Sequence, residues 1–233
     1  MNIDKNVNII LEKLKKIPYC EGIIYTGSRL EGNFSKNSDY DFTVLISQGK
    51  SYYKIFNYKN LLVDICCATE KIIKEQDITK EKISNPELSI IANGNIIFDK
   101  SGKMKKIQKQ AQKIWKSGPN KLTKKDLAEI GHLCNTFLHK LSKDKSDEAY
   151  YYWNEIMKKM VIMFFELHQT WQPKFFEIEK NINKLDSNFF VLYKKANTSK
   201  DNKTKIKMTK KMIEYLVKKF KLPETGEIYF SKD

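Results

Sequence analysis

The feature that most constrains the fold is a change of hydrophobic period near residue 101 of the 233-residue chain. Before this point, apolar residues form short runs separated by Gly, Asn and Pro, which is typical of strands joined by turns. After it, apolar residues recur every three or four positions over long stretches, as in amphipathic helices. The pattern predicts an α+β fold, with a mixed-sheet domain over residues 1–103 and a helical bundle over residues 104–233.

Five segments of the first part are predicted to be strands, because each is a short apolar run bounded by turn residues. They are residues 22–26, 42–46, 52–58, 61–68 and 94–99. Helices are predicted at residues 7–16, ended by Pro18, and from an N-cap at Thr69 to about residue 81. The first part is therefore expected to contain a sheet with covering helices.

The second part is predicted to consist of long helices. The first ends at the break SGPN, and the next begins at Thr123, an N-cap residue with Asp126 three positions later. The apolar stripe of this helix is formed by Leu127, Ile130, Cys134, Phe137 and Leu141. A second stripe lies within residues 149–167, and further helices are expected at residues 174–196 and 205–220. These stripes predict a bundle with a buried core.

The chain carries a formal net charge of +15, and most of the excess lies in the second part. A basic surface can attract polyphosphates or nucleic acid. Lys, Asn and Ile are abundant throughout, however, and basic residues do not alternate with aromatic ones, so nucleic acid is a less favoured partner. Arg29 is the only arginine among 43 basic residues, and its planar guanidinium is suited to phosphate or carboxylate groups.

The sequence carries no sign of a membrane or secreted protein. No stretch approaches the roughly 18 consecutive apolar residues of a membrane span, and the N-terminal residues lack the apolar block of a signal peptide. The four cysteines are scattered and form no C-x-x-C motif, which is typical of a reducing compartment. We therefore expect a cytoplasmic protein without a membrane partner, either a monomer or a homodimer.

Three aspartates in the first part indicate a cation site. Asp39 and Asp41 stand two apart at the start of a predicted strand, so both carboxylates are expected on one face, about 6–7 Å apart. Carboxylates this close repel each other unless a proton or a cation lies between them. Asp64 stands within another apolar run, where a buried carboxylate without a partner would be unfavourable. If the two strands are neighbours, all three acids face one cation, and such oxygen ligands suit Mg²⁺.

The turn after the first predicted strand has the features of an anion site. Gly27 lets backbone N–H groups approach an anion closely, and the hydroxyl of Ser28 adds a donor. The turn can also open a helix, whose N-terminus favours phosphate. Together with the three aspartates, this turn predicts a site that holds a metal-bound triphosphate.

These residues resemble the DNA polymerase β-like nucleotidyltransferase superfamily. The similarity lies in YTGSRLEGNFSKNSDYDFTVLI followed by LLVDICCA, that is, a strand, Gly-Ser, a spacer, Asp-x-Asp at a strand start and a later acidic residue. The matching positions are Gly27, Ser28, Ser38, Asp39, Asp41 and Asp64. The layout is most similar to small bacterial enzymes that modify antibiotics of the kanamycin or lincosamide kind, which pair a mixed-sheet nucleotidyltransferase domain with a C-terminal helical bundle.

The resemblance implies four nucleotide-binding residues. Gly27 and Ser28 would bind the β- and γ-phosphates of the nucleotide, and Ser38 would lie beside them. Arg29 would steady the triphosphate, with an ion pair to a nearby acidic residue as the alternative. The nucleoside triphosphate, with ATP preferred, is therefore the expected first partner.

The resemblance also assigns the three acids. Asp39 and Asp41 would bind Mg²⁺, and Asp64 would bind a second Mg²⁺ or activate the acceptor hydroxyl. All three are thus predicted to be catalytic residues and metal ligands. The reaction would be in-line attack of a hydroxyl on the α-phosphorus, with pyrophosphate leaving.

The implied function is transfer of AMP from ATP to a hydroxyl of a small molecule, such as an aminoglycoside or a lincosamide antibiotic. The basic second part argues against the cationic aminoglycosides. A partner protein, as in antitoxin-like nucleotidyltransferases, and RNA are alternative acceptors. Asp126 and Glu129 are alternative candidates for the general base, and the aromatic run 150–153 is a candidate for stacking on a sugar or base.

Overall fold

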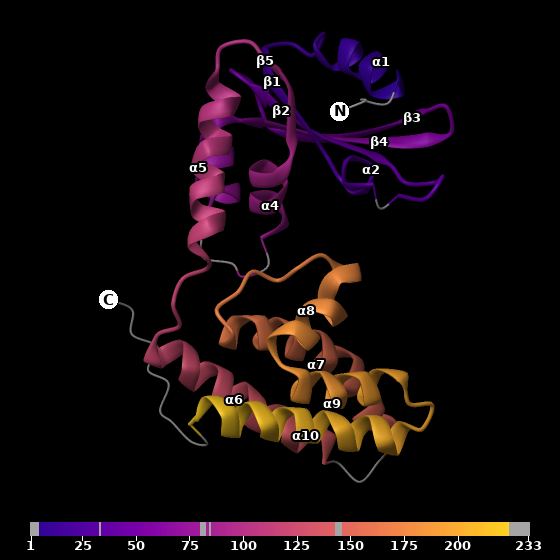
Figure 1. Cartoon of the computed structure of the whole chain (residues 1–233), viewed down its shortest axis with the longest axis vertical. Coiled ribbons are helices and arrows are strands. Elements are labelled where there is room, and N and C mark those ends of the chain that lie inside the picture. Colours follow the sequence, from indigo (N-terminus) through magenta and orange to yellow (C-terminus); the bar gives the residue numbers. More distant parts are fainter. Residues whose placement is uncertain (1–4, 33, 80–82, 84, 143–145, 224–233) are drawn as a thin grey trace. The chain divides into compact units, whose positions relative to one another are not determined.

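The computed structural model of the chain describes residues 5–32, 34–79, 83, 85–142 and 146–223. The chain divides into two compact units, Met1–Gly118 and Pro119–Asp233, which we call the sheet unit and the helical unit (Figure 1). The sheet unit contains a mixed sheet with helices, and the helical unit contains helices and connecting segments. The predicted α+β class is therefore confirmed.

Five strands form the sheet in the order β3-β4-β2-β1-β5. Their bounds are β1 Cys20–Thr26, β2 Tyr40–Ile46, β3 Tyr52–Tyr58, β4 Leu61–Thr69 and β5 Asn95–Asp99. β2 and β4 run parallel, whereas the other neighbouring pairs are antiparallel. Each strand overlaps with a predicted one, because short apolar runs between turn residues favour extended backbone.

Helices lie on both faces of this sheet. They are α1 Lys5–Leu14, α2 Ser28–Glu31, α3 Glu70–Ile72, the π-helix η1 Ile73–Asp77, α4 Pro86–Asn93 and α5 Lys103–Ser117. α1 buries Val7, Ile10 and Leu14 in one core with β1, β2 and β4. α4 and α5 lie on the other side of the sheet (Figure 1). The helix expected from Thr69 is present as α3 and η1, which end at Asp77.

The hydrophobic pattern does not predict α4, although its start is encoded locally. The side chain of Asn85 accepts a hydrogen bond from the N–H of Leu88 at 2.9 Å, and Pro86 occupies the first turn, where proline fits well. The helix has only 8 residues, so its apolar residues form no extended stripe. In the sequence, only its capping residues, Asn85 and Pro86, indicate that a helix begins here.

Helix α5 belongs to the sheet unit because it packs on the sheet and on α4. A Cβ on Gly22 of β1 would stand 2.7 Å from the Cβ of Met104. The side-chain amide of Gln108 donates hydrogen bonds of 2.8 and 3.1 Å to two backbone carbonyls in and just after α4. These contacts extend the sheet unit to Gly118, beyond the boundary expected near residue 103.

The helical unit begins with the predicted capping box. Its elements are α6 Lys124–Leu141, α7 Ser146–Leu167, the 3-10 helix η2 Phe175–Glu177, α8 Ile178–Leu185, α9 Ser187–Thr198 and α10 Asn202–Phe220. The hydroxyl of Thr123 accepts from the N–H of Asp126 at 3.1 Å, and the carboxylate of Asp126 accepts from the N–H of Thr123 at 2.6 Å. The single helix expected over residues 174–196 is instead divided at Asp186, which caps α9.

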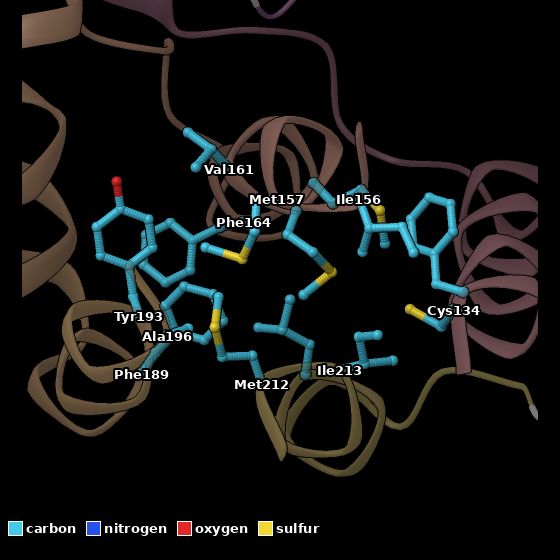
Figure 2. Close-up of a cluster of buried hydrophobic side chains, with 14 of the residues drawn as sticks. Cys134, Ile156, Met157, Val161, Phe164, Phe189, Tyr193, Ala196, Met212 and Ile213 are labelled. Atoms are coloured by element: carbon cyan, nitrogen blue, oxygen red, sulfur yellow. The ribbon is translucent and has the colours of Figure 1, made fainter. Parts of the chain in front are cut away.

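Most residues of the two predicted apolar stripes are buried in the core of the helical unit, where α6, α7, α9 and α10 meet (Figure 2), and Leu127 is partly buried against it. The rings of Phe164 and Phe189 stack with centroids 4.5 Å apart. Met212 and Ile213 from α10 are fully buried in the same cluster. Although this core is apolar, none of the helices in the part of the chain that the structure describes is long and apolar enough to cross a membrane.

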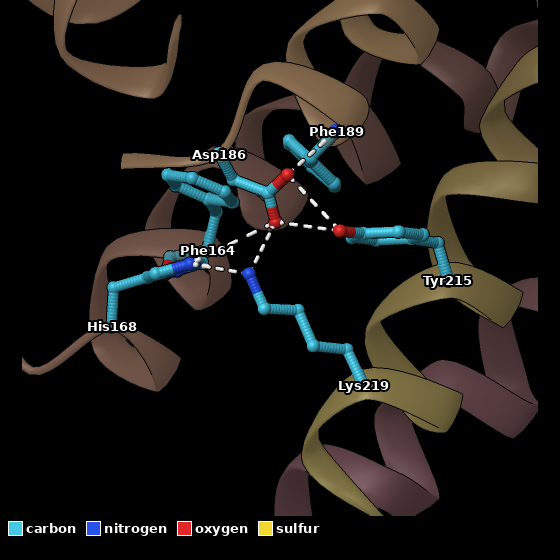
Figure 3. Close-up of polar contacts among 6 residues, drawn as sticks. All are labelled: Phe164, His168, Asp186, Phe189, Tyr215 and Lys219. Carbon is cyan, nitrogen blue, oxygen red and sulfur yellow. Dashed lines mark hydrogen bonds and ion pairs between the residues drawn. The ribbon is translucent and has the colours of Figure 1, made fainter. Parts of the chain in front are cut away.

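A buried carboxylate connects the ends of three helices in this unit (Figure 3). The side chain of Asp186 is only 3% exposed. It accepts hydrogen bonds from the N–H of Phe189 at 2.9 Å, from the hydroxyl of Tyr215 at 2.9 Å, and from the ammonium of Lys219 at 2.5 Å. Because every one of these partners is a donor, the ionised form of Asp186 is satisfied in the core.

His168 at the end of α7 completes this cluster. Its Nδ1–H donates to the carbonyl of Phe164 at 2.8 Å, and its Nε2 lies 3.3 Å from the ammonium of Lys219. Burial lowers the pKa of His168. Burial alone would raise the pKa of Asp186, but its hydrogen bonds from Lys219, Phe189 and Tyr215 lower it. The cluster therefore favours a neutral imidazole beside an ionised carboxylate.

Replacing Asp186 with Ala is expected to destabilise the helical unit by about 2 kcal/mol, because the change removes an N-cap and leaves the partly buried hydroxyl of Tyr215 without this acceptor. Chemical denaturation followed by circular dichroism measures this loss. Asp201→Ala is the matched control, since Asp201 caps α10 through the N–H groups of Lys203 and Thr204 but is exposed. Equal losses in the two variants would show that the buried cluster adds nothing beyond capping.

The stability of the helical unit is expected to fall in acid. Because the pKa of His168 is lowered from its ordinary 6.5, the unfolded chain takes up a proton first, and stability decreases as the pH falls below about 6.5. The pKa of Asp186 is lowered from 3.8, so the stability that its ionised form contributes is lost only below about pH 3.8. Thermal unfolding from about pH 7.5 to about pH 4.5 measures the effect. His168→Gln should flatten the slope, and His132→Gln, at an exposed position, should not.

Candidate active site

Two carboxylates meet at the centre of the sheet. β2 and β4 are parallel neighbours, and their register pairs Asp41 with Asp64. Neighbouring strands lie about 4.8 Å apart, and residues paired across them project from the same face of the sheet. The side chains of Asp41 and Asp64 therefore lie side by side. The alternate residues Phe42 and Ile65 belong to the core with α1, which places both carboxylates on the opposite face. The strand adjacency that the three-acid hypothesis requires for Asp64 is thus confirmed.

The other expectations for the acids are met only in part. Asp39 precedes β2, which begins at Tyr40, so the pleat of the strand does not fix the direction of its carboxylate. It lies in the connection that leads into β2, two residues before Asp41. Asp64 is partly exposed and not enclosed in the core, so solvent reaches the carboxylate pair from this face.

Gly27 is required by the position of the Asp41 carboxylate. Its φ is +86°, in the region that side chains with a Cβ disfavour. A Cβ built on Gly27 would stand 1.9 Å from Oδ2 of Asp41 and 2.8 Å from its Cγ. Thr26, just before it, is paired with Asp41 in the register of β1 and β2. The predicted anion-binding turn therefore lies directly against one acid of the pair.

The two predicted serines occupy the ends of the segment between β1 and β2. Ser28 is the first residue of the short helix α2 and follows Gly27, so its hydroxyl and N–H belong to the same turn. Ser38 lies just before Asp39, where its hydroxyl accepts a hydrogen bond from the N–H of Ser35 at 3.0 Å. Ser38 thus stabilises the loop, whereas Ser28 is placed at the turn itself.

Arg29 holds the same loop against the start of β2. Its Nε donates to the carbonyl of Ser38 at 2.7 Å, and its Nη2 donates to the carbonyl of Lys36 at 3.3 Å. The guanidinium carbon lies 4.4 Å from the ring centroid of Tyr40. These contacts use the planar fork that distinguishes Arg from Lys, and they position the residues that lead to Asp39. Contact of Arg29 with a triphosphate stays a prediction.

The oxygen ligands of this site fit Mg²⁺. Among the described residues, no group of three or more His, Cys, Asp or Glu side chains is placed to hold a metal ion. Mg²⁺ in nucleotide sites is commonly held by one or two carboxylates together with phosphate oxygens and water. Asp41 and Asp64 supply such a pair, and Gly27 places the phosphate turn beside it. A third contribution from Asp39 stays a prediction.

The acids of the helical unit differ in their surroundings. Hydrogen bonds from the backbone and hydroxyl of Thr123 lower the pKa of Asp126, which makes this carboxylate a weaker base. Glu129 is half-buried on the same helix. Glu166 on α7 was not predicted as a functional residue, yet burial and, to a smaller extent, Asp126 raise its pKa. In the sequence, only the position of Glu166 at the end of an apolar stripe could have indicated that this acid is partly buried.

The aromatic run at the start of α7 is mainly structural. Trp153 is buried, and its Nε1–H donates to the hydroxyl of Thr209 at 2.9 Å. The ring of Tyr150 stacks on Trp153 at 5.8 Å. Tyr151 is 74% exposed, so it is the member of this run with the largest surface free to contact a ligand.

Comparisons with known proteins agree with this arrangement. Residues 8–103 match the family model described as Polymerase beta, Nucleotidyltransferase. The fold is similar to that of a nucleotidyltransferase-like protein from Exiguobacterium sibiricum, with a TM-score of 0.55 and 14% sequence identity, over 92% of this chain and 73% of that chain. A search of curated proteins finds no match.

The mixed sheet, with a Gly-Ser turn beside paired aspartates, belongs to a chain with a nucleotidyltransferase-like fold. Residues 8–103, which match the Polymerase beta nucleotidyltransferase model, form a domain of the DNA polymerase β-like nucleotidyltransferase superfamily. The resemblance recognised in the sequence at the level of the superfamily is therefore confirmed.

Proposed function

We propose that this protein is an Mg²⁺-dependent nucleotidyltransferase that moves a nucleoside monophosphate, AMP from ATP, onto a hydroxyl of a small molecule. The observation that carries the proposal is the pairing of Asp41 with Asp64 beside the Gly27 turn. Two neighbouring carboxylates attract a divalent cation, and the turn next to them can accommodate phosphate oxygens.

Each residue of the site would have a separate role in the reaction. The backbone of Gly27 and Ser28 would hold the terminal phosphates, and Asp41, with Asp39 beside it, would hold Mg²⁺. Bound Mg²⁺ would supply charge stabilisation at the attacking and leaving oxygens. Asp64 would orient the acceptor hydroxyl and accept its proton as the oxygen attacks the α-phosphorus. Loop residues 34–39, fixed by Arg29, would keep Asp39 in place.

The acceptor is proposed to be a hydroxylated antibiotic of the aminoglycoside or lincosamide kind, on the strength of the layout of a nucleotidyltransferase domain followed by helices. The experiment is a turnover assay of the full chain with Mg²⁺, each of the common nucleoside triphosphates and a panel of these antibiotics. Pyrophosphate release, together with a mass increase of the antibiotic by one nucleoside monophosphate, is the expected result. Pyrophosphate release that does not depend on Mg²⁺ would contradict the proposal. The absence of both pyrophosphate release and Mg²⁺-dependent nucleotide binding would contradict it as well.

A further inference from the structure

Large apolar side chains stand exposed beside the acid pair. The register of the antiparallel strands β3 and β4 pairs Ile55 with Asp64, so their side chains project from one face and are direct neighbours. Leu62 stands two residues before Asp64 on β4 and shares that face. Ile55 is 62% exposed and Leu62 is 49% exposed. A partly polar site is therefore bordered on its β3 side by apolar surface.

Tyr53 extends this surface along β3. It pairs with Cys66, which lies on the face of Asp64, and it is 73% exposed. We call Tyr53, Ile55 and Leu62 the apolar border of the site. Single exposed apolar residues are ordinary on protein surfaces, but adjacent ones beside reactive groups are typical of binding sites.

The other face of the same two strands is covered in part, although Tyr52 there is 41% exposed. Phe56, Tyr58 and Leu61 are partly buried against the core that contains α1. On the face of the acid pair, by contrast, the three border residues are 49% to 73% exposed, where β3 forms the edge of the sheet (Figure 1).

We propose that the apolar border binds the acceptor, and that the acceptor presents its reacting hydroxyl next to an alkyl or aromatic face. This inference rests on the proposed function. Asp41 and the Gly27 turn lie on one side of Asp64, and the border lies on the other. The phosphates would occupy the turn, so the acceptor would bring its hydroxyl to Asp64 from the β3 side. It would then lie over Ile55, because β3 is one strand spacing, about 4.8 Å, from β4.

This geometry favours a hydroxylated compound of low charge over a polycationic one. Ammonium groups placed against the alkyl side chains of Ile55 and Leu62 would lose hydration that these side chains cannot replace, whereas an alkyl or aromatic face would release water from both surfaces. In the transfer, the acceptor oxygen bonds to the α-phosphorus and the bond from that phosphorus to the pyrophosphate oxygen breaks. Pyrophosphate leaves, and the hydroxyl proton passes to Asp64.

The test uses the full chain with ATP, Mg²⁺ and two sets of acceptors. One set has apolar faces (a lincosamide, a macrolide, octyl β-D-glucoside), and the other is polycationic (kanamycin, neomycin). The variant is Ile55→Thr combined with Leu62→Gln, and Val191→Thr is the control, since Val191 on α9 is 63% exposed. Turnover gives kcat and KM for each acceptor, and calorimetry gives the affinity for Mg²⁺-ATP.

The best acceptor is expected in the apolar set, and its KM is expected to rise about 10-fold in the double variant, with nucleotide affinity unchanged. A polycationic best acceptor, an unchanged KM, or no binding and no turnover in the apolar set would overturn the inference. A dimeric wild type and a monomeric double variant would also overturn it, because the border would then be a subunit interface. Absence of Mg²⁺-ATP binding in the wild type would instead refute the proposed function itself.

Discussion

Replacing Asp41 or Asp64 with Asn is expected to lower the rate of pyrophosphate release by roughly 100-fold or more, because charge stabilisation by a bound metal is worth several kcal/mol and each 1.36 kcal/mol is a factor of ten. Asn has nearly the shape of Asp but lacks its charge, so the sheet should fold normally. The rate at saturating Mg²⁺-ATP and acceptor measures the effect.

The same variants make a second, independent prediction about stability. The two neighbouring carboxylates repel each other when no cation is bound, so each Asn variant should be at least as stable as the wild type without Mg²⁺. Mg²⁺ should raise the Tm of the wild type more than that of either variant. Asp99→Asn is the control, since Asp99 accepts from the N–H groups of Met104 and Lys105 and is not part of the proposed site. Full activity in Asp64→Asn would refute the assignment of Asp64.

Replacing Gly27 with Ala is expected to reduce the rate by about 100-fold, although the residue carries no functional group. The added Cβ would meet Oδ2 of Asp41 at 1.9 Å, so the carboxylate must move away from the turn. A displacement of this size at reacting groups can cost about two orders of magnitude in rate. The rate should be measured well below the Tm of the variant, so that unfolding does not contribute.

Gly49→Ala separates the two effects of this substitution. Gly49 has a φ of +103°, and a Cβ there would meet nothing within 4 Å. This control also places a side chain at positive φ, at a cost of about 1 kcal/mol or more, without touching the site. Both variants should lose stability, and only Gly27→Ala should lose activity. Similar activity in the two variants would show that the contact with Asp41 is unimportant.

The strands and the pairing of the acids could be predicted because they depend on local patterns. Apolar runs between turn residues fix the extended segments. A carboxylate at Asp64, within such a run, indicates a neighbouring partner, and the register supplies Asp41 as that partner. The position of Asp39 could not be predicted in the same way, since the first residue of a strand depends on hydrogen bonds with its neighbours.

The roles of several other residues depend on contacts between distant segments. Arg29 stands out in the sequence, but its carbonyl acceptors become visible only in the folded loop. Asp186 interrupts a helical period, whereas its partners Tyr215 and Lys219 come from a helix about 30 positions later in the chain. Likewise, the exposure of Ile55 and Leu62 cannot be read from strands that are apolar on both faces.

The parallel pairing of β2 with β4 has a consequence for how the candidate active site forms during folding. β3 and β4 form a hairpin through Lys59 and Asn60, both with positive φ, so this hairpin can form locally. Asp41 and Asp64 become neighbours only when the hairpin docks on β2, a slower event that closes a longer loop. A nascent chain that has made its hairpin but not this docking step therefore lacks the proposed reaction centre, and recovery of the proposed activity during refolding would report on assembly of the central strands.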